Sequence, residues 1–507
     1  MSQPRRPRPL CEAVDALCRA LLPHTGSALA TEVHQVRARL QEPLEVAVTG
    51  RVSVGKSTLV NALIGRAVAP TSAGECTRLV TRFGYGSVDR VDVVLCAGGS
   101  VALGLDSDAA VPSDVATRAG VAVSEVSHLQ VSLSSALLVD LAVIDTPGLG
   151  ALERAPLAGA QHAAVAGADA VLHVLTHRAR TEDTAALTAF TGTDARAAFR
   201  ADTADRPPGP ATVLAVLNKV DTAAAESVLG GDTTVWGAAQ RLAAEQSAVL
   251  GSLVVDVLPA VGLLAQTCET GSLSAADVAT LRALATGDDA TRSVMLASTE
   301  LFTSLECAVA PGERARLLDK LDLYGVQCAV RLLQADPAVS AGRLRAALYD
   351  ASGMAALRRR LDTVLTARAD VIKAAAALAT LDGLARRSPV PAEQSAVREG
   401  VEGLLALPQA HELRVAEVLS LLTSGAVTLP ADLLTEVLAL ASEREPAARL
   451  AMAGDDRAEM TARALDRAGW WRSFASFGAS PPQARVAHVV HRAYYLLWQQ
   501  LTAHGQR

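Results

Sequence analysis

The spacing of hydrophobic and polar positions differs from one part of the chain to another. Between residues 11 and 40, apolar residues recur every three or four positions in two stretches, which a Pro-His-Thr-Gly break at residues 23–26 separates. This spacing predicts two amphipathic helices. From about residue 44 to about residue 265, short β-rich runs alternate with helical stretches, and after about residue 275 only helical patterns remain.

The β-rich runs indicate a single α/β domain. They read LEVAVTG, RLVTRFGYG, VDVVLC, LQVSLSS, LLVDLAVID, DAVLHVLTH, TVLAVLN and LVVDVLP. Strands that alternate with helices are typical of a mostly parallel central sheet. We therefore expect helices over residues 1–43, an α/β domain over 44–270 with a surface loop at 201–210, and an all-α region over 271–507.

Composition excludes several classes of protein. The 507 residues carry a formal net charge of -6, which argues against a dedicated nucleic-acid binder. No run without a charged residue exceeds 14 positions, whereas a spanning helix needs about 20 apolar ones, so we do not expect an integral membrane protein. Charged residues also interrupt any signal core near the start, which favours the cytoplasm. The seven cysteines are expected to be buried, unpaired thiols.

The first chemical motif is GRVSVGKS, residues 50–57, which lies between a predicted strand and a predicted helix. It matches G-x-x-x-x-G-K-[ST], a loop whose backbone N–H groups converge on phosphate at a helix start. Lys56 is expected to reach the β- and γ-phosphates, and the Ser57 hydroxyl to ligate Mg²⁺. The predicted nucleotide-binding residues of this loop are Gly50, Ser53, Val54, Gly55, Lys56, Ser57 and Thr58.

Two further segments complete a predicted phosphate and magnesium site. LAVIDTPG, residues 141–148, is a strand that ends in D-x-x-G. Asp145 is expected to hold Mg²⁺ through water, and the Gly148 amide to contact the γ-phosphate. The polar segment at residues 70–78 is expected to be the first switch, with Thr77 on Mg²⁺ and Thr71 and Thr81 as alternatives.

The motif NKVD, residues 218–221, indicates the nucleotide. A carboxylate at Asp221 accepts from guanine N1–H and the exocyclic amino group together, whereas adenine offers no such pair. Asn218 is expected to brace the phosphate loop, and the Lys219 stem to lie over the base. GTP is therefore the expected nucleotide. The segment LPAVG, residues 258–262, either donates a backbone N–H to guanine O6 or is an ordinary strand-to-helix turn.

Together with the T-R-x-x-T sequence at residues 77–81 and the downstream helices, these motifs resemble bacterial dynamin-like GTPases, most closely the isoniazid-inducible type of actinobacteria. The resemblance implies a GTPase domain on a helical stalk, with the helices of residues 1–43 packed into the same bundle. It also implies self-association through the GTPase domain and peripheral membrane remodelling at the inner face of the cell membrane. A dynamin-like paralogue is an expected recruiter, and nucleic acid is not an expected partner.

The resemblance also suggests catalytic roles and shows two departures. Lys56, Ser53, Thr77 and Gly148 are the expected catalytic residues, and Ser53 matches a serine that helps dynamins hold a monovalent cation. However, Val52 and Leu149 stand where related GTPases carry glutamine, and neither apolar side chain orients water. We therefore expect slow GTP hydrolysis by a monomer and faster hydrolysis when two GTPase domains meet.

Three features of the helical region have two interpretations each. Seven aromatic residues near the end form either a helical core, which we favour, or a lipid-facing cluster. The uncharged residues 418–431 are either a buried connection, which we favour, or a tip that dips into lipid. Arg358, Arg359 and Arg360 form either a solvated helix face, which we favour, or a lipid contact. The alternative function is a GTP-controlled switch that binds a protein or ribosomal partner without deforming membranes.

Overall fold

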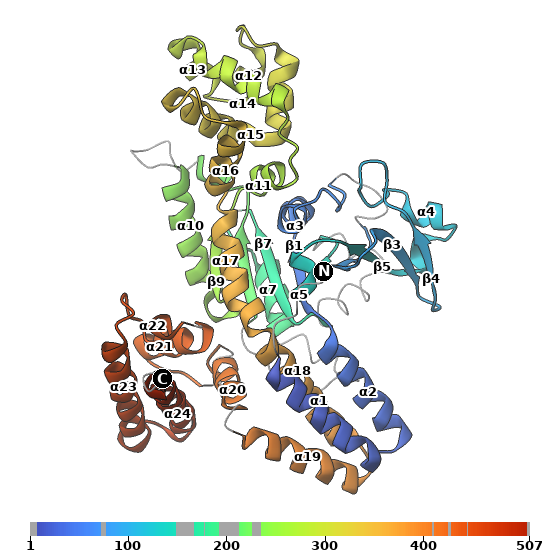
Figure 1. Ribbon diagram of the computed structural model, residues 1–507, viewed down its shortest axis with the longest axis vertical. Helices are drawn as coiled ribbons and strands as arrows, with labels where there is room; N and C mark the ends of the chain where they lie inside the picture. Colours follow the sequence, from blue (N-terminus) through green and yellow to red (C-terminus); the bar gives the residue numbers. More distant parts are fainter. Residues whose placement is uncertain are drawn as a thin grey trace.

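A central α/β domain carries helical groups at both ends and a further helical lobe at one side (Figure 1). The computed structural model describes residues 8–71, 78–148, 167–176, 178–191, 212–225, 235–407, 410–423, 427–443 and 445–503. The predicted surface loop at 201–210 lies outside these ranges.

The domain is built on a nine-stranded mixed sheet with the order β4-β3-β5-β2-β6-β1-β7-β8-β9. The five strands from β6 to β9 in this order, β6, β1, β7, β8 and β9, are all parallel, whereas the β2–β6, β3–β5 and β3–β4 pairs are antiparallel. The strands are β1 (Leu44–Gly50), β2 (Thr81–Tyr85), β3 (Arg90–Leu95), β4 (Ser100–Leu103), β5 (Val126–Leu133), β6 (Leu141–Asp145), β7 (Ala170–Leu175), β8 (Val213–Leu217) and β9 (Asp256–Pro259). The predicted α/β class is confirmed.

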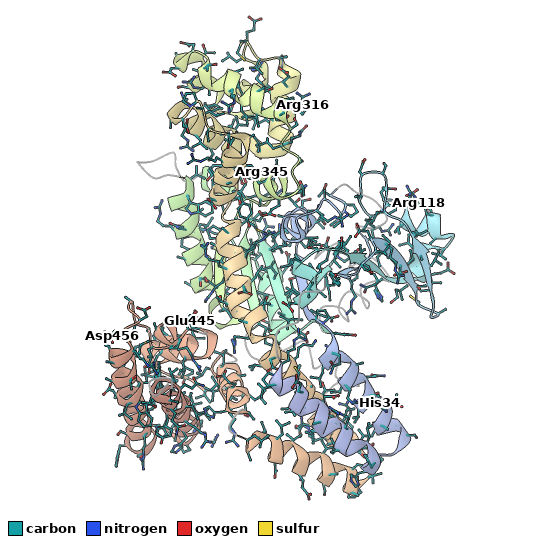
Figure 2. All side chains as sticks on the ribbon, viewed as in Figure 1. His34, Arg118, Arg316, Arg345, Glu445 and Asp456 are labelled. Carbon is teal, nitrogen blue, oxygen red and sulfur yellow. The ribbon has the colours of Figure 1, made fainter. Side chains whose placement is uncertain are left out.

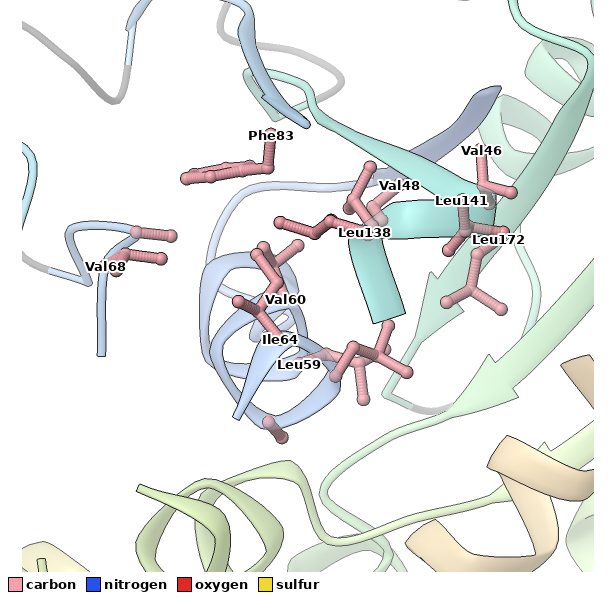
Figure 3. Packing of buried hydrophobic residues seen from close by; sticks show 14 of the residues in the cluster. Val46, Val48, Leu59, Val60, Ile64, Val68, Phe83, Leu138, Leu141 and Leu172 are labelled. Carbon is pink, nitrogen blue, oxygen red and sulfur yellow. The ribbon is translucent and has the colours of Figure 1, made fainter. Parts of the chain in front are cut away.

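Both faces of the sheet are covered, which explains why its central strands read as continuous apolar runs. Val46 and Val48 of β1 point to the face that α3 covers, and Ala47 points to the opposite face. Figure 3 shows Leu59, Val60 and Ile64 of α3 among these buried residues. The helices and short 3-10 turns of this domain are α3 (Lys56–Ile64), α4 (Val115–Ala119), η3 (Val123–Glu125), α5 (Leu137–Asp140), α7 (Thr181–Thr191), α9 (Val220–Ala225), α10 (Val235–Leu250), η4 (Gly251–Leu253) and α11 (Gly262–Glu269).

The helices after the α/β domain form separate groups. Five of them make an upper lobe at the carboxyl end of the parallel strands (Figure 1). They are α12 (Ala275–Thr286), α13 (Asp289–Met295), α14 (Thr299–Ser304), α15 (Pro311–Ala335) and α16 (Ala341–Ala351). The chain then runs back along the sheet through α17 (Met354–Val364) and η5 (Thr366–Arg368), so α17 joins the upper lobe to the helices at the other end.

A bundle at the opposite end brings the N-terminal helices together with two helices that follow α17. Its members are α1 (Pro9–Leu21), η1 (Leu22–His24), α2 (Ser27–Gln41), α18 (Ala369–Arg387) and α19 (Pro391–Leu405). The Asp370 carboxylate accepts hydrogen bonds from the Leu10 and Cys11 amides at 3.0 and 2.8 Å, so α18 caps the start of α1. The two predicted N-terminal helices and the break between them are confirmed.

A third group forms a C-terminal lobe with its own hydrophobic core (Figure 1). It consists of α20 (His411–Thr423), α21 (Ala431–Ser442), α22 (Pro446–Arg449), α23 (Arg457–Phe477) and α24 (Pro481–Ala503). Figure 2 shows side chains filling the spaces within each group, with Asp456 at the start of α23 and Arg316 in the upper lobe. Among the helices in the described ranges, none is long and apolar enough to cross a bilayer.

A buried ion pair joins the bundle to the sheet. Lys373 of α18 lies 3.1 Å from Asp169, which directly precedes β7, and both side chains are 3% exposed. The Lys373 ammonium also donates to the Pro43 carbonyl at 3.1 Å, and Asp169 accepts from the Glu45 amide at 3.0 Å. The starts of β1 and β7 are therefore held to one lysine of the bundle.

Several local predictions were wrong. The first residues of LLVDLAVID form the short helix α5 instead of strand, because Leu138 packs into the core while the chain turns toward β6. Strand β4 was not predicted; it is a short edge strand after a glycine turn. Cys96 and Cys307 are exposed rather than buried, since each lies in a connection at the surface, whereas Cys11, Cys18 and Cys268 are buried. Cys76 lies outside the described residues.

Candidate nucleotide-binding site

The loop after β1 has the backbone that phosphate binding requires. Gly50 and Gly55 adopt φ values of +141° and +88°, and a Cβ at Gly55 would lie 2.5 Å from the Asn218 amide nitrogen. Glycine is needed at both positions because L side chains rarely adopt these angles. Ser53 also has a positive φ of 65°. The loop then enters α3 at Lys56, so the first amides of that helix face the same space.

Lys56 folds back over this loop. Its ammonium donates to the carbonyls of Gly50 and Arg51 at 3.1 and 2.9 Å, and the side chain is buried. Burial lowers the pKa of Lys56, and the nearby Asp145 carboxylate partly offsets that effect. The ammonium therefore lies among the loop carbonyls, at the place where an incoming phosphate oxygen could replace them.

Ser57 and Asp145 meet across the neighbouring strands β1 and β6. The Ser57 hydroxyl donates to Asp145 Oδ2 at 2.8 Å, while Asp145 Oδ1 is buried and accepts from no group in the described residues. Burial raises the pKa of Asp145 to about 6, against the opposing effects of Ser57 and Lys56. A hydroxyl beside an unsatisfied carboxylate oxygen is a hard donor set that suits Mg²⁺.

Asn218 connects the base-side loop to the phosphate loop. It is 1% exposed, and its amide nitrogen donates to the Val54 carbonyl at 2.8 Å. Its side-chain oxygen accepts from the Gly262 amide at 2.8 Å. Lys219 follows with a φ of 57°, and its stem lies beside Gly55. Asn218 thus joins three loops through one side chain.

Asp221 carries the unsatisfied group expected of a base-recognition site. Its Oδ1 atom is buried and has no hydrogen-bond partner within the described ranges. Burial raises the pKa of Asp221 to about 6, and the negative charge of Asp322 adds to the effect. A buried carboxylate oxygen without a donor is costly unless a ligand supplies one.

Asp322 belongs to the upper lobe, so that lobe contributes charge to the nucleotide site. The residue interrupts α15 with φ 54° and ψ 178°, angles that are favourable essentially only for glycine. Its carboxylate accepts from the Leu323 amide at 2.6 Å and thereby restarts the helix. Helix α15 is tied to α11 because Thr267 donates to the Lys320 carbonyl at 2.5 Å.

Three backbone amides of the segment at residues 258–262 donate within the protein. The amides of Ala260, Val261 and Gly262 donate to Leu217 O, Ser352 O and Asn218 Oδ1, respectively. Pro259 has no N–H. These bonds favour the alternative of a strand-to-helix turn, and a contact with guanine O6 stays a prediction.

The structure describes some of the remaining predicted site residues but not all of them. Gly148 lies against Val52, and Val54 and Thr58 belong to the phosphate loop and the first turn of α3. Thr77 and Leu149 lie outside the described residues. Of the two alternatives to Thr77, Thr81 is buried inside β2, whereas Thr71 is the last described residue before the switch segment. The structure therefore brings the phosphate, D-x-x-G and NKVD loops together but does not test the switch threonine.

Sequence reasoning missed two groups that support the site. Arg358 of α17 donates to the Ala62 and Leu63 carbonyls at 2.9 and 3.0 Å, so it satisfies the end of the helix that begins at Lys56. Arg360 pairs with Asp256 and Glu443. The prediction of a solvated arginine face was wrong for these two residues and correct for Arg359, which is exposed. No local motif marks such long-range partners.

The second group is a buried chain of hydrogen bonds beside the phosphate loop. Thr49 lies 2.9 Å from His173 Nδ1, and His173 Nε2 lies 3.2 Å from Asp183. Burial alone raises the pKa of Asp183, but hydrogen bonds from His173 and the Arg180 amide hold it below its usual value. In the neutral imidazole tautomer whose Nε2–H donates to Asp183, Nδ1 accepts from the Thr49 hydroxyl. This chain fixes the end of β1 against β7.

The sheet, the phosphate loop and the NKVD loop define a GTPase domain of the dynamin type. Residues 46–197 match the Dynamin family. The chain as a whole is a bacterial dynamin-like protein similar to isoniazid-induced protein IniC of Mycobacterium tuberculosis (strain ATCC 25618 / H37Rv), with 29% identity over 463 residues and 89% of each chain covered. Isoniazid-induced protein IniA of the same strain is 32% identical over 179 residues, which cover 34% of this chain and 27% of IniA.

Two solved structures have detectable but low similarity. One belongs to an oligomerised bacterial dynamin pair described as a mechanism for long-range sensing and tethering of membranes; its TM-score is 0.33 at 13% identity, with 99% of this chain and 77% of that chain covered. The other is LeoA, a bacterial dynamin GTPase from ETEC, with a TM-score of 0.27 at 10% identity and coverage of 98% and 94%.

Proposed function

We propose that this protein binds GTP with Mg²⁺ and hydrolyses it to GDP and phosphate, using the loops that Asn218 joins. The observation that carries the proposal is a pair of buried carboxylate oxygens without a hydrogen-bond partner among the described residues, Asp145 Oδ1 at the end of β6 and Asp221 Oδ1 after β8. Guanine N1–H and its amino group supply donors for Asp221, and a hard cation suits Asp145 and Ser57. Adenine supplies no matching donors, so the site favours GTP.

Each residue of the phosphate loop then has a defined role. Lys56 exchanges its bonds to the Gly50 and Arg51 carbonyls for bonds to the β- and γ-phosphates. Ser57 and Asp145 hold Mg²⁺, which when bound neutralises charge on the phosphates. The Gly148 amide contacts the γ-phosphate, Thr77 completes the metal site, and Ser53 supports a monovalent cation. Asn218 holds the base-side loop and the phosphate loop in a fixed position relative to each other.

Efficient hydrolysis requires self-association through the GTPase domain. Val52 is 57% exposed beside Gly148, at the position where the γ-phosphate is expected. An apolar side chain there excludes bulk water but does not orient the attacking one. A second GTPase domain that covers this edge would exclude solvent and fix the switch segments.

The cellular role that fits best is membrane remodelling or maintenance by a peripheral protein at the inner face of the cell membrane. The resemblance to bacterial dynamin-like GTPases implies this role, and the multi-lobed helical region attached to the GTPase domain is in keeping with it. A dynamin-like paralogue is a candidate recruiter.

GTP turnover measured against protein concentration, with and without anionic liposomes, tests the proposal. We expect the rate per molecule to rise with concentration and with lipid, and Lys56→Ala to abolish it. Arg118→Ala, which removes an exposed cation far from the site on the β4 edge, serves as the control and should retain turnover. GTP hydrolysis without any lipid response would instead favour a GTP-controlled switch that binds a protein or ribosomal partner.

A further inference from the structure

The C-terminal lobe ends in a helical hairpin whose tip exposes an aromatic ring. Helices α23 and α24 pack along each other, and residues 478–480 connect them. Phe477, the last residue of α23, is 93% exposed, more than any other large hydrophobic side chain in the described part of the chain. Such a residue at a projecting turn has no packing role within this molecule.

Two further aromatic residues extend from this ring along α23. Phe474 and Trp470 lie three and seven positions before Phe477, so the three share one helix face. The Trp470 and Phe474 rings are stacked at a centroid distance of 5.3 Å and an interplanar angle of 9°, and Trp470 is 39% exposed.

The fully buried Trp471 anchors this face to the lobe. Its indole donates to Glu436 at 2.9 Å, and its ring meets Phe474 edge-on at 5.7 Å. The seven aromatic residues near the end of the sequence therefore include both buried and exposed side chains. The core interpretation is confirmed for Trp471 and Tyr494 and wrong for Trp470, Phe477 and Tyr495, which are exposed.

The charged residues on the two helices of the hairpin have one sign near the tip. Residues 467–503 contain no aspartate or glutamate, and the exposed Arg472 and Arg485 flank the turn on its two helices. The preceding acidic residue on α23 is Asp466, about 16 Å along the helix from Phe477. The Glu436 carboxylate is already paired with Arg467. The tip therefore combines exposed aromatic surface with two arginines that form no ion pair among the described residues, while Asp432 at the start of α21 is the acidic residue that follows the neighbouring segment 427–430.

An uncharged segment lies beside the same end of the lobe. Gln483, in the first turn of α24, donates to the Thr428 carbonyl at 2.8 Å. Thr428 and Pro430 are exposed, and residues 427–430 carry no charge. For the uncharged residues 418–431, we favoured a buried connection over a tip that dips into lipid. Burial is confirmed for Val418, Leu419, Leu422 and Val427, while residues 424–426 lie outside the described ranges.

We propose that this hairpin tip, formed by Trp470, Arg472, Phe474, Phe477 and Arg485, docks on the headgroup region of an anionic lipid bilayer, with Phe477 inserted. The proposal rests on the peripheral membrane role proposed above and names the surface that performs it. A narrow projecting turn offers little of the roughly 800 Å² per partner that a stable protein interface buries. Aromatic rings and unpaired cations side by side instead match a lipid interface with a negative surface potential.

Cosedimentation of the full chain with vesicles of phosphatidylcholine alone, or mixed with phosphatidylglycerol, tests this surface. We expect wild type to bind the anionic vesicles more tightly. Phe477→Ser should lower that partitioning about tenfold, and Arg472→Glu combined with Arg485→Glu should remove the preference for anionic lipid. Val249→Ser removes a side chain that is 63% exposed on α10, and this control should bind like wild type. None of these changes should alter GTP turnover without lipid.

The outcomes distinguish a failure of the proposed hairpin-tip surface from a failure of the proposed membrane role. Wild type that binds no vesicles contradicts the membrane role itself, and the surface with it. If wild type binds but Phe477→Ser binds equally well, only the proposed surface is wrong. Equal binding of the charge-reversed variant to both vesicle types supports the contribution of the arginines, whereas a retained anionic preference contradicts it.

Discussion

The hydroxyl of Ser57 donates to the carboxylate of Asp145 across 2.8 Å, so the phosphate loop and the D-x-x-G strand meet through a single hydrogen bond. The other oxygen of Asp145 is buried and has no partner among the described residues. Of the contacts described above, this one joins the two motifs that are expected to share a magnesium ion.

Ser57→Ala should therefore weaken the effect of magnesium on nucleotide binding. The variant loses a direct ligand, and we expect the magnesium-dependent gain in GTP affinity to fall at least tenfold. GTP affinity measured with magnesium and with a chelator checks this, because the chelated value is an internal control that should hardly change. If the magnesium-dependent gain in GTP affinity is unchanged, Ser57 is not a magnesium ligand.

Recognition of guanine should depend on pH through Asp221. Its pKa is raised to about 6, so the carboxylate that accepts from guanine is progressively lost as pH falls through 6. Below that point we expect GTP affinity to fall by up to about tenfold per pH unit. Titrations between pH 5 and 8 test this, with Asp221→Asn as the control, because protonation of the phosphates affects both proteins equally.

The same shift predicts the stability of the nucleotide-free protein. A raised pKa means that the folded state binds the proton more tightly than the unfolded state, so the carboxylate destabilises the fold at a pH above 6 and this cost vanishes below about 4. Asp221→Asn should consequently raise the unfolding temperature at pH 8 and have little effect at pH 4. A lower unfolding temperature at pH 8 would contradict a desolvated carboxylate.

Asp322→Asn tests whether the upper lobe influences the base pocket. Removing this charge removes one cause of the raised pKa of Asp221, so the midpoint of the GTP affinity profile should move to lower pH. Asp319→Asn, three residues earlier on α15, is the matched charge control and should leave the midpoint unchanged. If the two variants behave alike, Asp322 has no specific effect.

The ion pair between Lys373 and Asp169 should couple the bundle to the GTPase domain. Lys373→Met leaves a buried carboxylate without its main partner and should cost about 3–5 kcal/mol in the free energy of unfolding. The double variant Lys373→Met with Asp169→Asn should recover most of that loss. Urea denaturation measures both, and equal stability of the single and double variants would argue against the pair.

The sequence was sufficient for the buried strands of the sheet and for the positions of the nucleotide motifs, although not for the edge strand β4. Buried strands such as β1 and β8 are continuous apolar runs, and each nucleotide motif follows directly on a strand end. Parallel strands end at one edge, so the topology alone brings Lys56, Asp145 and Asn218 together.

Long-range partners could not be predicted in this way. Arg358 caps α3 from almost 300 positions away, and the charge of Asp322, at the break in α15, acts on Asp221 from about 100 positions away. The division of the helical region into an upper lobe, a bundle and a C-terminal lobe also depends on which apolar stripes meet. Helical periodicity shows that each stripe exists but does not identify its partner.

Isothermal titration calorimetry of the wild-type protein with GTP and with ATP, both in the presence of magnesium, tests the central claim most directly. We predict binding of GTP at least a thousandfold tighter than that of ATP, and a loss of this gap in Asp221→Asn. Equal heats for the two nucleotides, or no heat with any guanine nucleotide, would contradict the account.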